Sequence, residues 1–353
     1  MDNALKKNGR NVSLDALRII SMIMIVTLHY LGKGGLIKVE NNNTFYYFLY
    51  NLLKSMSIIA VNCYVLISGY FLINSEFKWK KIFKLWGETI FYSISIYLII
   101  VILGYKDIEI KGLIKSFFPI LTKEYWFVNT YLLMYILSPF LNKLIFSLNK
   151  EDYKKLIIIL VVGFSILSLL PSSYTFDTTN GYSITWFVCL YIFAGYIKLH
   201  LTKNVKTSIY LNVYLFTSLF ITIAGIIIDI LCNHLGIASQ KEKLLQYNSI
   251  FVLIESVALF MFFKQLQISN SKLRKIIPTI APLTFAVYLI HEQIELREIL
   301  YKQILHTEIC YNNHYSILIF VGSVLTIFII CSLIEFVRQK LIKYSKILYI
   351  KIS

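Results

Sequence analysis

Charged residues are scarce in this sequence: Asp, Glu, Lys and Arg together make up 15% of its 353 residues. A soluble domain carries about 25% charged and about 45–50% apolar residues. Here 57% of the residues are hydrophobic, the mean hydropathy is +0.67, and long apolar runs recur from one end to the other. This balance excludes an ordinary soluble domain and predicts an integral membrane protein, with the lipid bilayer as its first partner.

Acidic residues are fewer than basic ones: the chain has 19 Asp and Glu and 35 Lys and Arg, which gives a formal net charge of +16. A basic excess of this size also occurs in proteins that bind nucleic acid. In a membrane protein it more often reflects cytoplasmic loops that are rich in Lys and Arg. We therefore expect no nucleic-acid partner.

The motifs of several common catalytic classes are absent from the chain. It has no Gly-rich phosphate loop and no Gly-x-Ser-x-Gly nucleophile elbow. His306, Cys310 and His314 recur every four residues, a spacing that would stack them on one helix face as zinc ligands. The stretch ends in loop-forming Asn-Asn and offers no clear fourth ligand, so we predict no metal site and no permanently bound cofactor.

Windows of roughly 17–25 apolar residues predict an all-α integral membrane protein, a bundle of about ten transmembrane helices in a single domain over residues 1–353. The expected spans are about 14–31, 46–73, 82–104, 125–147, 155–171, 184–200, 208–232, 248–267, 278–300 and 315–338. The second half of the span 278–300 is polar and suits the membrane interface. Segment 111–122 is short and apolar, as in an interfacial or re-entrant helix.

An even number of spans places both termini on the same side of the membrane. The N-terminus, the even-numbered connections and the C-terminal tail carry roughly twice as many Lys and Arg as the odd-numbered connections, and residues 172–183 carry none. This asymmetry predicts a multi-pass protein of the cell (plasma) membrane with cytoplasmic N- and C-termini.

The first expected span, "SLDALRIISMIMIVTLHYLGKGG", contains two polar groups at membrane depth. Arg18 and His29 are eleven residues apart, about three helical turns, so they share one face roughly 16 Å apart along the axis. Asp15 precedes Arg18 by three residues, a spacing at which the two side chains meet. With the N-terminus inside, Arg18 lies near the cytoplasmic end of the helix and His29 lies in its outer half.

Two interpretations fit these residues. Arg18 could extend to the cytoplasmic surface and His29 could be an interfacial residue, with no function. Ionisable groups within a membrane usually face a cavity or the bundle interior, however, and two on one face favour that alternative. Histidine is also the usual general base near neutral pH. We therefore expect His29 and Arg18 to be catalytic, supported by Asp15.

The same stretch resembles the first helix of the membrane-bound acyltransferase-3 family, the type that includes cell-surface glycan O-acetyltransferases. That helix starts with Leu-Asp-x-Leu-Arg and has a histidine after ten further residues, a pattern matched here by Leu14, Asp15, Leu17, Arg18 and His29. Further stretches are similar to the family in order along nearly the whole chain: Val61–Leu72, Tyr125–Asn142, Thr185–Tyr196 and Phe285–His291.

The resemblance implies an O-acyltransferase that takes an acyl group, commonly acetyl, from cytoplasmic acyl-CoA. The group is delivered across the membrane to a hydroxyl of a cell-surface or exported glycan. Acetyl-CoA is then a donor substrate and the glycan is the acceptor. The family's first-helix arginine and histidine, which are tied to catalysis, map onto Arg18 and His29. Because no attached hydrolase-like domain is visible, we expect direct modification of the acceptor or a separate extracytoplasmic partner enzyme.

The chemistry of the two residues agrees with acyl transfer. A base must take the proton of the acceptor hydroxyl, and His29 near the outer face suits that role. Arg18 is too far from His29 to hold the same reacting atoms, so it suits binding of a CoA phosphate or orientation of the thioester. The long, thin pantetheine arm of CoA would then thread a channel along this face of the helix.

A basic connection, "SEFKWKKIFKLW", follows the second expected span on the predicted cytoplasmic side and contains Lys80, Lys81 and Lys84. In the family a basic pair with two intervening residues, usually arginines, stands at this place and is thought to contact acyl-CoA. Lys81 and Lys84 occupy it here. Lysine lacks the bidentate phosphate contact of arginine but remains a point-charge partner. A loop that is basic only for topology would look the same.

Two further ionisable residues are candidates for the acceptor side or for support of the site. His291 ends an apolar run and should lie towards the outer side of its span, where it could line the acceptor site or be a simple interfacial residue. Glu255 is flanked by apolar residues deep in its span, which favours a buried functional or structural role.

Two other functions remain open. The first is a transporter of a small molecule, such as the amino acid serine, since some membrane domains of this type are fused to racemases. Discontinuous helices at matching places in two halves would favour it, but five prolines and no visible symmetry between halves do not. The second is a glycan polymerase or flippase, whose external loops typically carry several arginines, whereas Arg297 is the single arginine of the expected outer loops.

Overall fold

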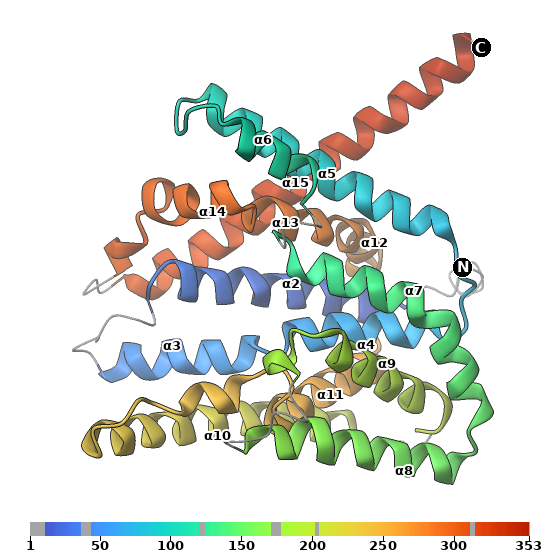
Figure 1. Ribbon diagram of the computed structural model, residues 1–353, viewed down its shortest axis with the longest axis vertical. Helices are drawn as coiled ribbons and strands as arrows, with labels where there is room; N and C mark the ends of the chain where they lie inside the picture. Colours follow the sequence, from blue (N-terminus) through green and yellow to red (C-terminus); the bar gives the residue numbers. More distant parts are fainter. Residues whose placement is uncertain are drawn as a thin grey trace.

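The computed structural model describes residues 11–36, 44–119, 124–170, 178–201, 205–310 and 315–352. Within these ranges the chain is helical and contains no strand, which confirms the expected all-α fold. Most of the long helices run roughly horizontally in Figure 1 and pack side by side as a bundle.

The α-helices of the described chain are α2 (Val12–Lys33), α3 (Thr44–Ser57), α4 (Ala60–Leu72), α5 (Trp79–Ile102), α6 (Ile110–Phe117), α7 (Trp126–Ser147), α8 (Lys150–Val161), α9 (Ile184–Leu199), α10 (Thr207–His234), α11 (Ile250–Gln265), α12 (Ser271–Ile280), α13 (Thr284–His291), α14 (Ile294–Ile299) and α15 (Ser316–Ile352). Short helical turns that matter for the site are η4 (Thr179–Gly181), η5 (Lys241–Leu245) and η6 (Ala281–Leu283).

Helix α2 begins at a side-chain cap. The Asn11 side-chain oxygen accepts the backbone N–H groups of Ser13 and Leu14, two of the donors that a first helical turn leaves without partners. The 22 residues of α2 extend about 33 Å, enough to cross a bilayer. The helix lies in the middle of the bundle, where α3, α4, α11, α13 and α15 pack against it (Figure 1).

Eight helical stretches of the described chain are long and apolar enough to cross a membrane, and α9 is apolar but has only 16 residues. The chain is therefore a multi-pass membrane protein, while length and composition do not establish the expected count of ten. The expected span 155–171 is not among the eight. There α8 ends at Val161, and a π turn and a 3₁₀ turn follow it as far as Leu169.

Two other expected spans are interrupted. The span 46–73 consists of α3 and α4, which are separated by a turn at Ile58 and Ile59. In place of 278–300, the apolar stretch is Ser271–His291, and the polar residues after it form the separate helix α14. Burying polar side chains at membrane depth costs free energy, so the apolar, membrane-spanning segment ends where the polar residues begin. Helix α6 covers most of the short apolar segment expected at 111–122, of which residues 120–122 lie outside the described residues.

The ends of the helices gather on two sides of the bundle. The start of α2, the lysine-bearing start of α5 and the end of α15 lie on the right in Figure 1, whereas the end of α2 and the helix α14 lie on the left. Arg18 is therefore in the half of α2 that points to the side where α5 begins. His29 is in the half that points to the side of α14.

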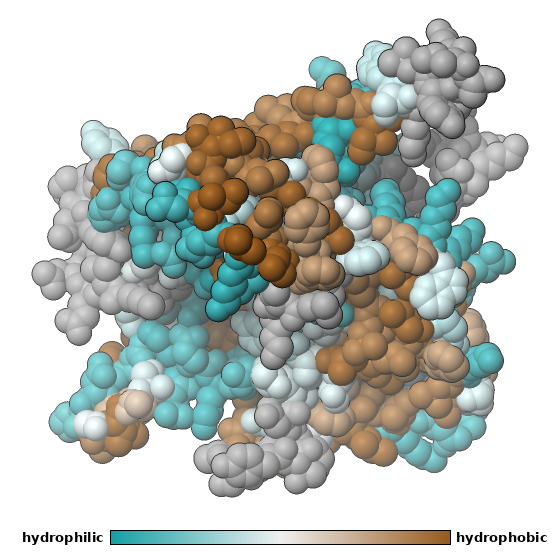
Figure 2. All heavy atoms as spheres, turned by 45° about the horizontal axis from the view of Figure 1, so that its top comes forward, coloured by the Kyte–Doolittle hydropathy of each residue, from teal (hydrophilic) through white to brown (hydrophobic). Residues whose placement is uncertain are grey.

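The outside of the bundle carries large apolar side chains. Figure 2 shows broad hydrophobic areas on its surface, interrupted by hydrophilic patches. Among the most exposed apolar residues are Ile102 on α5, Phe216 on α10 and Leu318 on α15, with exposed fractions of 70% or more. Exposed apolar side chains of this size on long helices suit contact with lipid tails.

Candidate functional site

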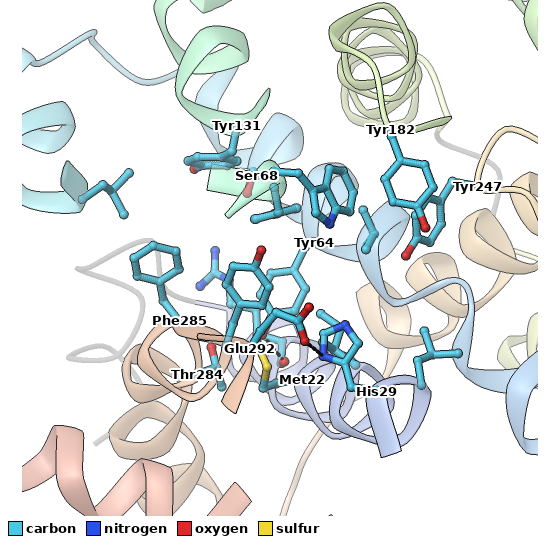
Figure 3. A pocket seen from close by; sticks show the side chains of 18 of the residues that line it. Met22, His29, Tyr64, Ser68, Tyr131, Tyr182, Tyr247, Thr284, Phe285 and Glu292 are labelled. Atoms are coloured by element: carbon cyan, nitrogen blue, oxygen red, sulfur yellow. Dashed lines mark hydrogen bonds and ion pairs between the residues drawn. The ribbon is translucent and has the colours of Figure 1, made fainter. Parts of the chain in front are cut away.

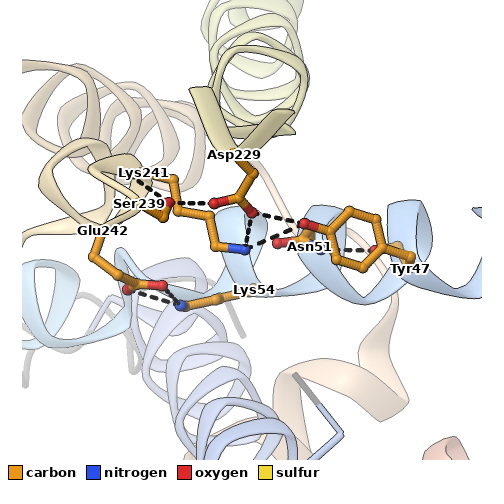
Figure 4. Close-up of polar contacts among 7 residues, drawn as sticks. All are labelled: Tyr47, Asn51, Lys54, Asp229, Ser239, Lys241 and Glu242. Carbon is orange, nitrogen blue, oxygen red and sulfur yellow. Dashed lines mark hydrogen bonds and ion pairs between the residues drawn. The ribbon is translucent and has the colours of Figure 1, made fainter. Parts of the chain in front are cut away.

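A cavity of about 710 Å³ lies inside the bundle, between α2, α4, α5, α7 and the chain from η6 to α14. Arg18 and His29 both line it, so the face of α2 that the sequence singles out is one wall of this cavity. Figure 3 shows the His29 side of the cavity, with aromatic side chains from several helices around it. Eleven residues of helix separate the two groups by roughly 16 Å, so one cavity spans both ends of the α2 face.

At one end of the cavity, Arg18 is held by Asp15. The Arg18 Nη1 atom lies 2.7 Å from Asp15 Oδ1, and the Asp15 side chain is buried. The guanidinium group also lies 5.4 Å from the centre of the Phe71 ring. The Arg18 side chain is 32% exposed, and an arginine carries five N–H donors. The pair with Asp15 therefore fixes the direction of Arg18 while other donors can contact a ligand.

At the other end, His29 contacts two residues that are consecutive in the sequence. His29 Nδ1 lies 2.9 Å from His291 Nε2 and 3.1 Å from Glu292 Oε2 (Figure 3). The contact with Glu292 lacks hydrogen-bond geometry and is an electrostatic one. Arg297 Nη1 in turn lies 2.9 Å from Glu292 Oε1 and holds the carboxylate in place. The cavity end thus contains an imidazole backed by a second imidazole and by a carboxylate.

The hydrogen bonds of the two histidines assign their neutral tautomers. His291 Nδ1 lies 2.5 Å from the Val287 carbonyl oxygen, which can only accept, so this nitrogen carries the proton. His291 Nε2 is then an acceptor, and His29 Nδ1 donates to it. The remaining nitrogen of His29, Nε2, keeps its lone pair. His29 is therefore presented as a proton acceptor, with its ring orientation set by His291.

A helix break brings these residues to His29. Helix α13 ends at His291, and the Gln293 side chain caps α14 by accepting the backbone N–H groups of Glu295 and Leu296. The Tyr125 hydroxyl donates to the Leu289 carbonyl oxygen at 2.9 Å and steadies the end of α13. His291 and Glu292 leave the helix at the level of His29 because the chain changes direction there.

Glu124 is a further carboxyl group on the cavity wall, just before α7. The Ser93 hydroxyl donates to its Oε2 atom at 3.1 Å. Its buried Oε1 atom makes no well-formed hydrogen bond in the described chain. Burial raises the pKa of the Glu124 carboxyl above its ordinary value, against the smaller opposing effect of the Ser93 hydrogen bond. This group offers a hydrogen-bond acceptor to whatever enters the cavity.

The three lysines of the basic connection lie outside the cavity. Lys80, Lys81 and Lys84 are exposed on the first turns of α5. The Lys81 ammonium lies 5.7 Å from the centre of the Tyr135 ring, and Leu85, directly after Lys84, lines the cavity. The lysines therefore flank the part of the cavity wall formed by α5 without lining it.

Glu255 is not among the residues that line the cavity. It is fully buried between α10 and α11, and the Ser218 hydroxyl donates to its Oε1 atom. In the described chain no partner reaches its Oε2 atom, and it takes part in none of the ion pairs found there. This environment suits a structural role within the bundle.

We expect Glu255→Gln to keep the activity and the amount of folded protein within about twofold of the wild type. The amide preserves the acceptor for Ser218 without requiring a buried charge. Glu255→Leu removes that acceptor and should lower the yield of folded protein, measured by size-exclusion chromatography in detergent. A Glu255→Gln variant that is folded but inactive would place Glu255 in the mechanism.

Several residues of the cavity were not expected from the sequence. They are Glu292 and Arg297 at His29, Glu124, and the aromatic side chains of Trp126, Tyr182 and Tyr247. The signal for the first two was present in the polar stretch that directly follows His291 and contains the single arginine of the expected outer loops. Trp126 lies in the stretch Tyr125–Asn142 that resembles the family, although no role was predicted for it. Tyr182 and Tyr247 carried no signal, because tyrosine is abundant throughout the chain.

The described chain contains no group of three or more His, Cys, Asp and Glu that could hold a metal ion. Of the three residues with zinc-like spacing, His306 and Cys310 lie in or beside short turns before α15, and His314 lies outside the described residues. Cys310 is buried, and the Tyr30 hydroxyl lies 3.6 Å from its sulfur atom.

A family model described as an acyltransferase domain, of the acyltransferase-3 type, matches residues 11–336. The match covers most of the chain and includes every residue of the cavity named above. No curated protein and no solved structure was found to match.

Proposed function

Because the chain belongs to the acyltransferase-3 family, we propose that this membrane protein transfers an acyl group from acyl-CoA to a hydroxyl of a cell-surface glycan. Acetyl is the simplest acyl group for this reaction. The observation that carries the proposal is that one cavity is lined by Arg18 at one end and by His29 at the other. A donor and an acceptor can enter such a cavity from opposite sides of the membrane and meet inside it.

The Arg18 end suits the donor. Arg18 keeps donors for a phosphate or for the thioester, and the exposed lysines of α5 flank the neighbouring wall. The pantetheine arm is long and thin, and in the proposed reaction it brings the thioester from the Arg18 end of the cavity towards His29. This role requires the start of α2 and both termini to be cytoplasmic, as the distribution of Lys and Arg predicts for a plasma-membrane protein.

The His29 end suits the chemistry. His29 Nε2 takes the proton of the acceptor hydroxyl, and the oxygen attacks the thioester carbonyl carbon. The new C–O bond forms, the C–S bond breaks, and the CoA thiolate leaves with the proton that His29 took. Glu292 lies beside the opposite ring nitrogen and stabilises the imidazolium while it exists, and His291 fixes the ring.

We expect the double variant Lys81→Ala, Lys84→Ala to raise the KM for acetyl-CoA about three- to tenfold with little change in kcat. Two exposed cations beside the donor entrance attract the CoA phosphates, and the effect should shrink in high salt. The measurement is initial rate against acetyl-CoA concentration. A matched control is Lys154→Ala, Lys155→Ala, two exposed lysines on α8. An unchanged KM for acetyl-CoA would mean that the α5 lysines do not bind the donor and only mark the cytoplasmic side of the membrane.

The function is tested by mass spectrometry of surface glycans from cells with and without the gene. The proposal predicts acyl groups, 42 Da per site for acetyl, that disappear on deletion and return with the wild-type gene but not with His29→Ala. Identical glycan masses in both strains would contradict it.

One observation favours the alternative of a transporter. The span α3–α4 is broken at Ile58 and Ile59, and Ile58 lines the cavity. Broken helices at a central cavity are common in transporters of small molecules. Uptake of radiolabelled serine into vesicles that contain the purified protein decides this point, because an acyltransferase should give no uptake above empty vesicles.

A further inference from the structure

Three aromatic side chains meet on the wall of the cavity. The ring centres of Trp126 and Tyr182 are 4.5 Å apart, those of Tyr182 and Tyr247 are 5.0 Å apart, and those of Trp126 and Tyr247 are 6.0 Å apart. All three line the cavity. They come from the start of α7, from the residue after η4 and from the segment after η5. We call them the aromatic platform.

The backbone of η4 sets how Tyr182 and Tyr247 lie against each other. Thr179, Asn180 and Gly181 all have positive φ angles, 51°, 58° and 89°, a backbone conformation that residues other than glycine rarely adopt. A Cβ atom at Gly181 would lie 2.5 Å from the Tyr247 Cβ, so only glycine fits there. The Tyr247 N–H donates to the Asn180 carbonyl oxygen at 3.1 Å. Strain of this kind is typical of functional sites, where it fixes side chains in place.

The platform faces the same space as the catalytic groups. Figure 3 shows Tyr182 and Tyr247 next to each other on one part of the cavity wall, with His29 and Glu292 on another part of it. Tyr182 is 45% exposed and Trp126 is partly exposed, so these two rings are open to the cavity, whereas Tyr247 is only 8% exposed and packs against both. The cavity wall here also carries two buried oxygen atoms, Glu124 Oε1 and Tyr288 Oη, that make no well-formed hydrogen bond in the described chain. The Gln293 side chain and the Ile294 backbone approach the Glu124 carboxyl, and the Phe127 backbone approaches the Tyr288 hydroxyl.

This end of the cavity carries as many carboxyl groups as basic groups. Glu124 and Glu292 oppose Lys33 and Arg297, all of which line it. An acceptor made of polyol phosphates would need a binding site with a net positive charge, and this end of the cavity does not supply one. Flat aromatic faces with a few hydrogen-bonding oxygens instead match a saturated ring. Such a ring has C–H groups on one face, which pack on the electron-rich face of an aromatic ring, and hydroxyls around its edge.

We propose that the aromatic platform is a subsite for an uncharged pyranose ring of the acceptor, with its C–H face on the exposed rings of Trp126 and Tyr182, which the buried ring of Tyr247 supports. The ring hydroxyls bond to Glu124 and Tyr288, and one hydroxyl is directed to His29. This proposal rests on the proposed function and narrows its acceptor to an uncharged sugar, as opposed to an anionic polyol phosphate.

The first part of the test identifies the acceptor. Surface glycans are extracted from cells that lack the gene and separated into an uncharged fraction and a phosphate-bearing fraction. The purified full-length protein is given each fraction with radiolabelled acetyl-CoA. We expect label in the uncharged sugars. Label in the phosphate-bearing fraction alone overturns the subsite, and label in neither fraction overturns the proposed function itself.

The second part tests the platform by kinetics. Trp126→Leu and Tyr182→Leu should each raise the KM for the uncharged glycan by about tenfold, or about 1.4 kcal/mol for the loss of one aromatic face. The KM for acetyl-CoA should change by less than twofold, and Trp126→Phe should restore most of the glycan affinity. Trp79→Leu, an exposed tryptophan outside the cavity, is the matched control.

An acceptor KM within twofold of the wild type in both leucine variants would contradict the subsite while leaving acyl transfer intact. Loss of all activity in both Trp126→Leu and Trp126→Phe, with normal KM and kcat in Tyr182→Leu, would also contradict it. That pattern would mean that Trp126 supports the fold and that the face of Tyr182 binds nothing.

Discussion

His29→Ala should lower the rate of acyl transfer by at least about 100-fold while the protein still inserts into the membrane and folds. General-base catalysis contributes about 10²–10⁴-fold, and His29 Nε2 is the base that the tautomers of His29 and His291 leave available. Alanine also removes the group that Glu292 faces, and no other histidine lines the cavity in the part of the chain that the structure describes.

The measurement is transfer of labelled acetyl from acetyl-CoA to a glycan acceptor, with folded protein quantified by size-exclusion chromatography. His234→Ala is the matched control because His234 is exposed at the end of α10, away from the cavity. It should retain wild-type activity. If folded His29→Ala kept more than about a tenth of the wild-type rate, His29 would not be the base.

Glu292→Gln should lower kcat by about 100-fold with a much smaller change in the KM for acetyl-CoA. The carboxylate lies 3.1 Å from His29 Nδ1. In the proposed mechanism it stabilises the imidazolium, which exists only after proton transfer. An interaction that is absent from the ground state and forms on the way to the transition state affects kcat more than it affects the KM. Glutamine is nearly the same size but carries no charge, and it leaves Arg297 without its anionic partner.

The control for this variant is Glu298→Gln, because Glu298 is exposed on α14 and pairs only loosely with Lys302. It should behave like the wild type. A Glu292→Gln variant with normal kcat and a raised acceptor KM would assign Glu292 to acceptor binding and not to the proton transfer.

The sequence alone was sufficient to predict the all-helical membrane fold, the family, and the position of Arg18 and His29 on one face of α2. Arg18 and His29 lie on the same helix, so their relative position follows from the helical repeat without knowledge of any other element. The model match over residues 11–336 confirms the family. The ion pair of Asp15 with Arg18 could be anticipated for the same reason, since three residues separate them.

The partners of His29 could not be predicted, because their position depends on long-range packing. His291 was a candidate, but its contact with a residue 262 positions earlier depends on how α13 packs against α2. Glu292 reaches His29 only because the helix ends at His291, whereas the expected span continued to residue 300. The aromatic platform likewise joins three segments distant in the sequence through the backbone of η4.

The central claim is that donor and acceptor reach one cavity from opposite sides of the membrane. It is tested with the purified protein in sealed vesicles that hold glycan acceptor inside, with labelled acetyl-CoA added only outside. We predict label on the acceptor inside the vesicles. In a second set of vesicles that enclose neither substrate, acceptor and acetyl-CoA are both added outside, and we predict no label. Transfer that occurs only when donor and acceptor share one side would contradict it.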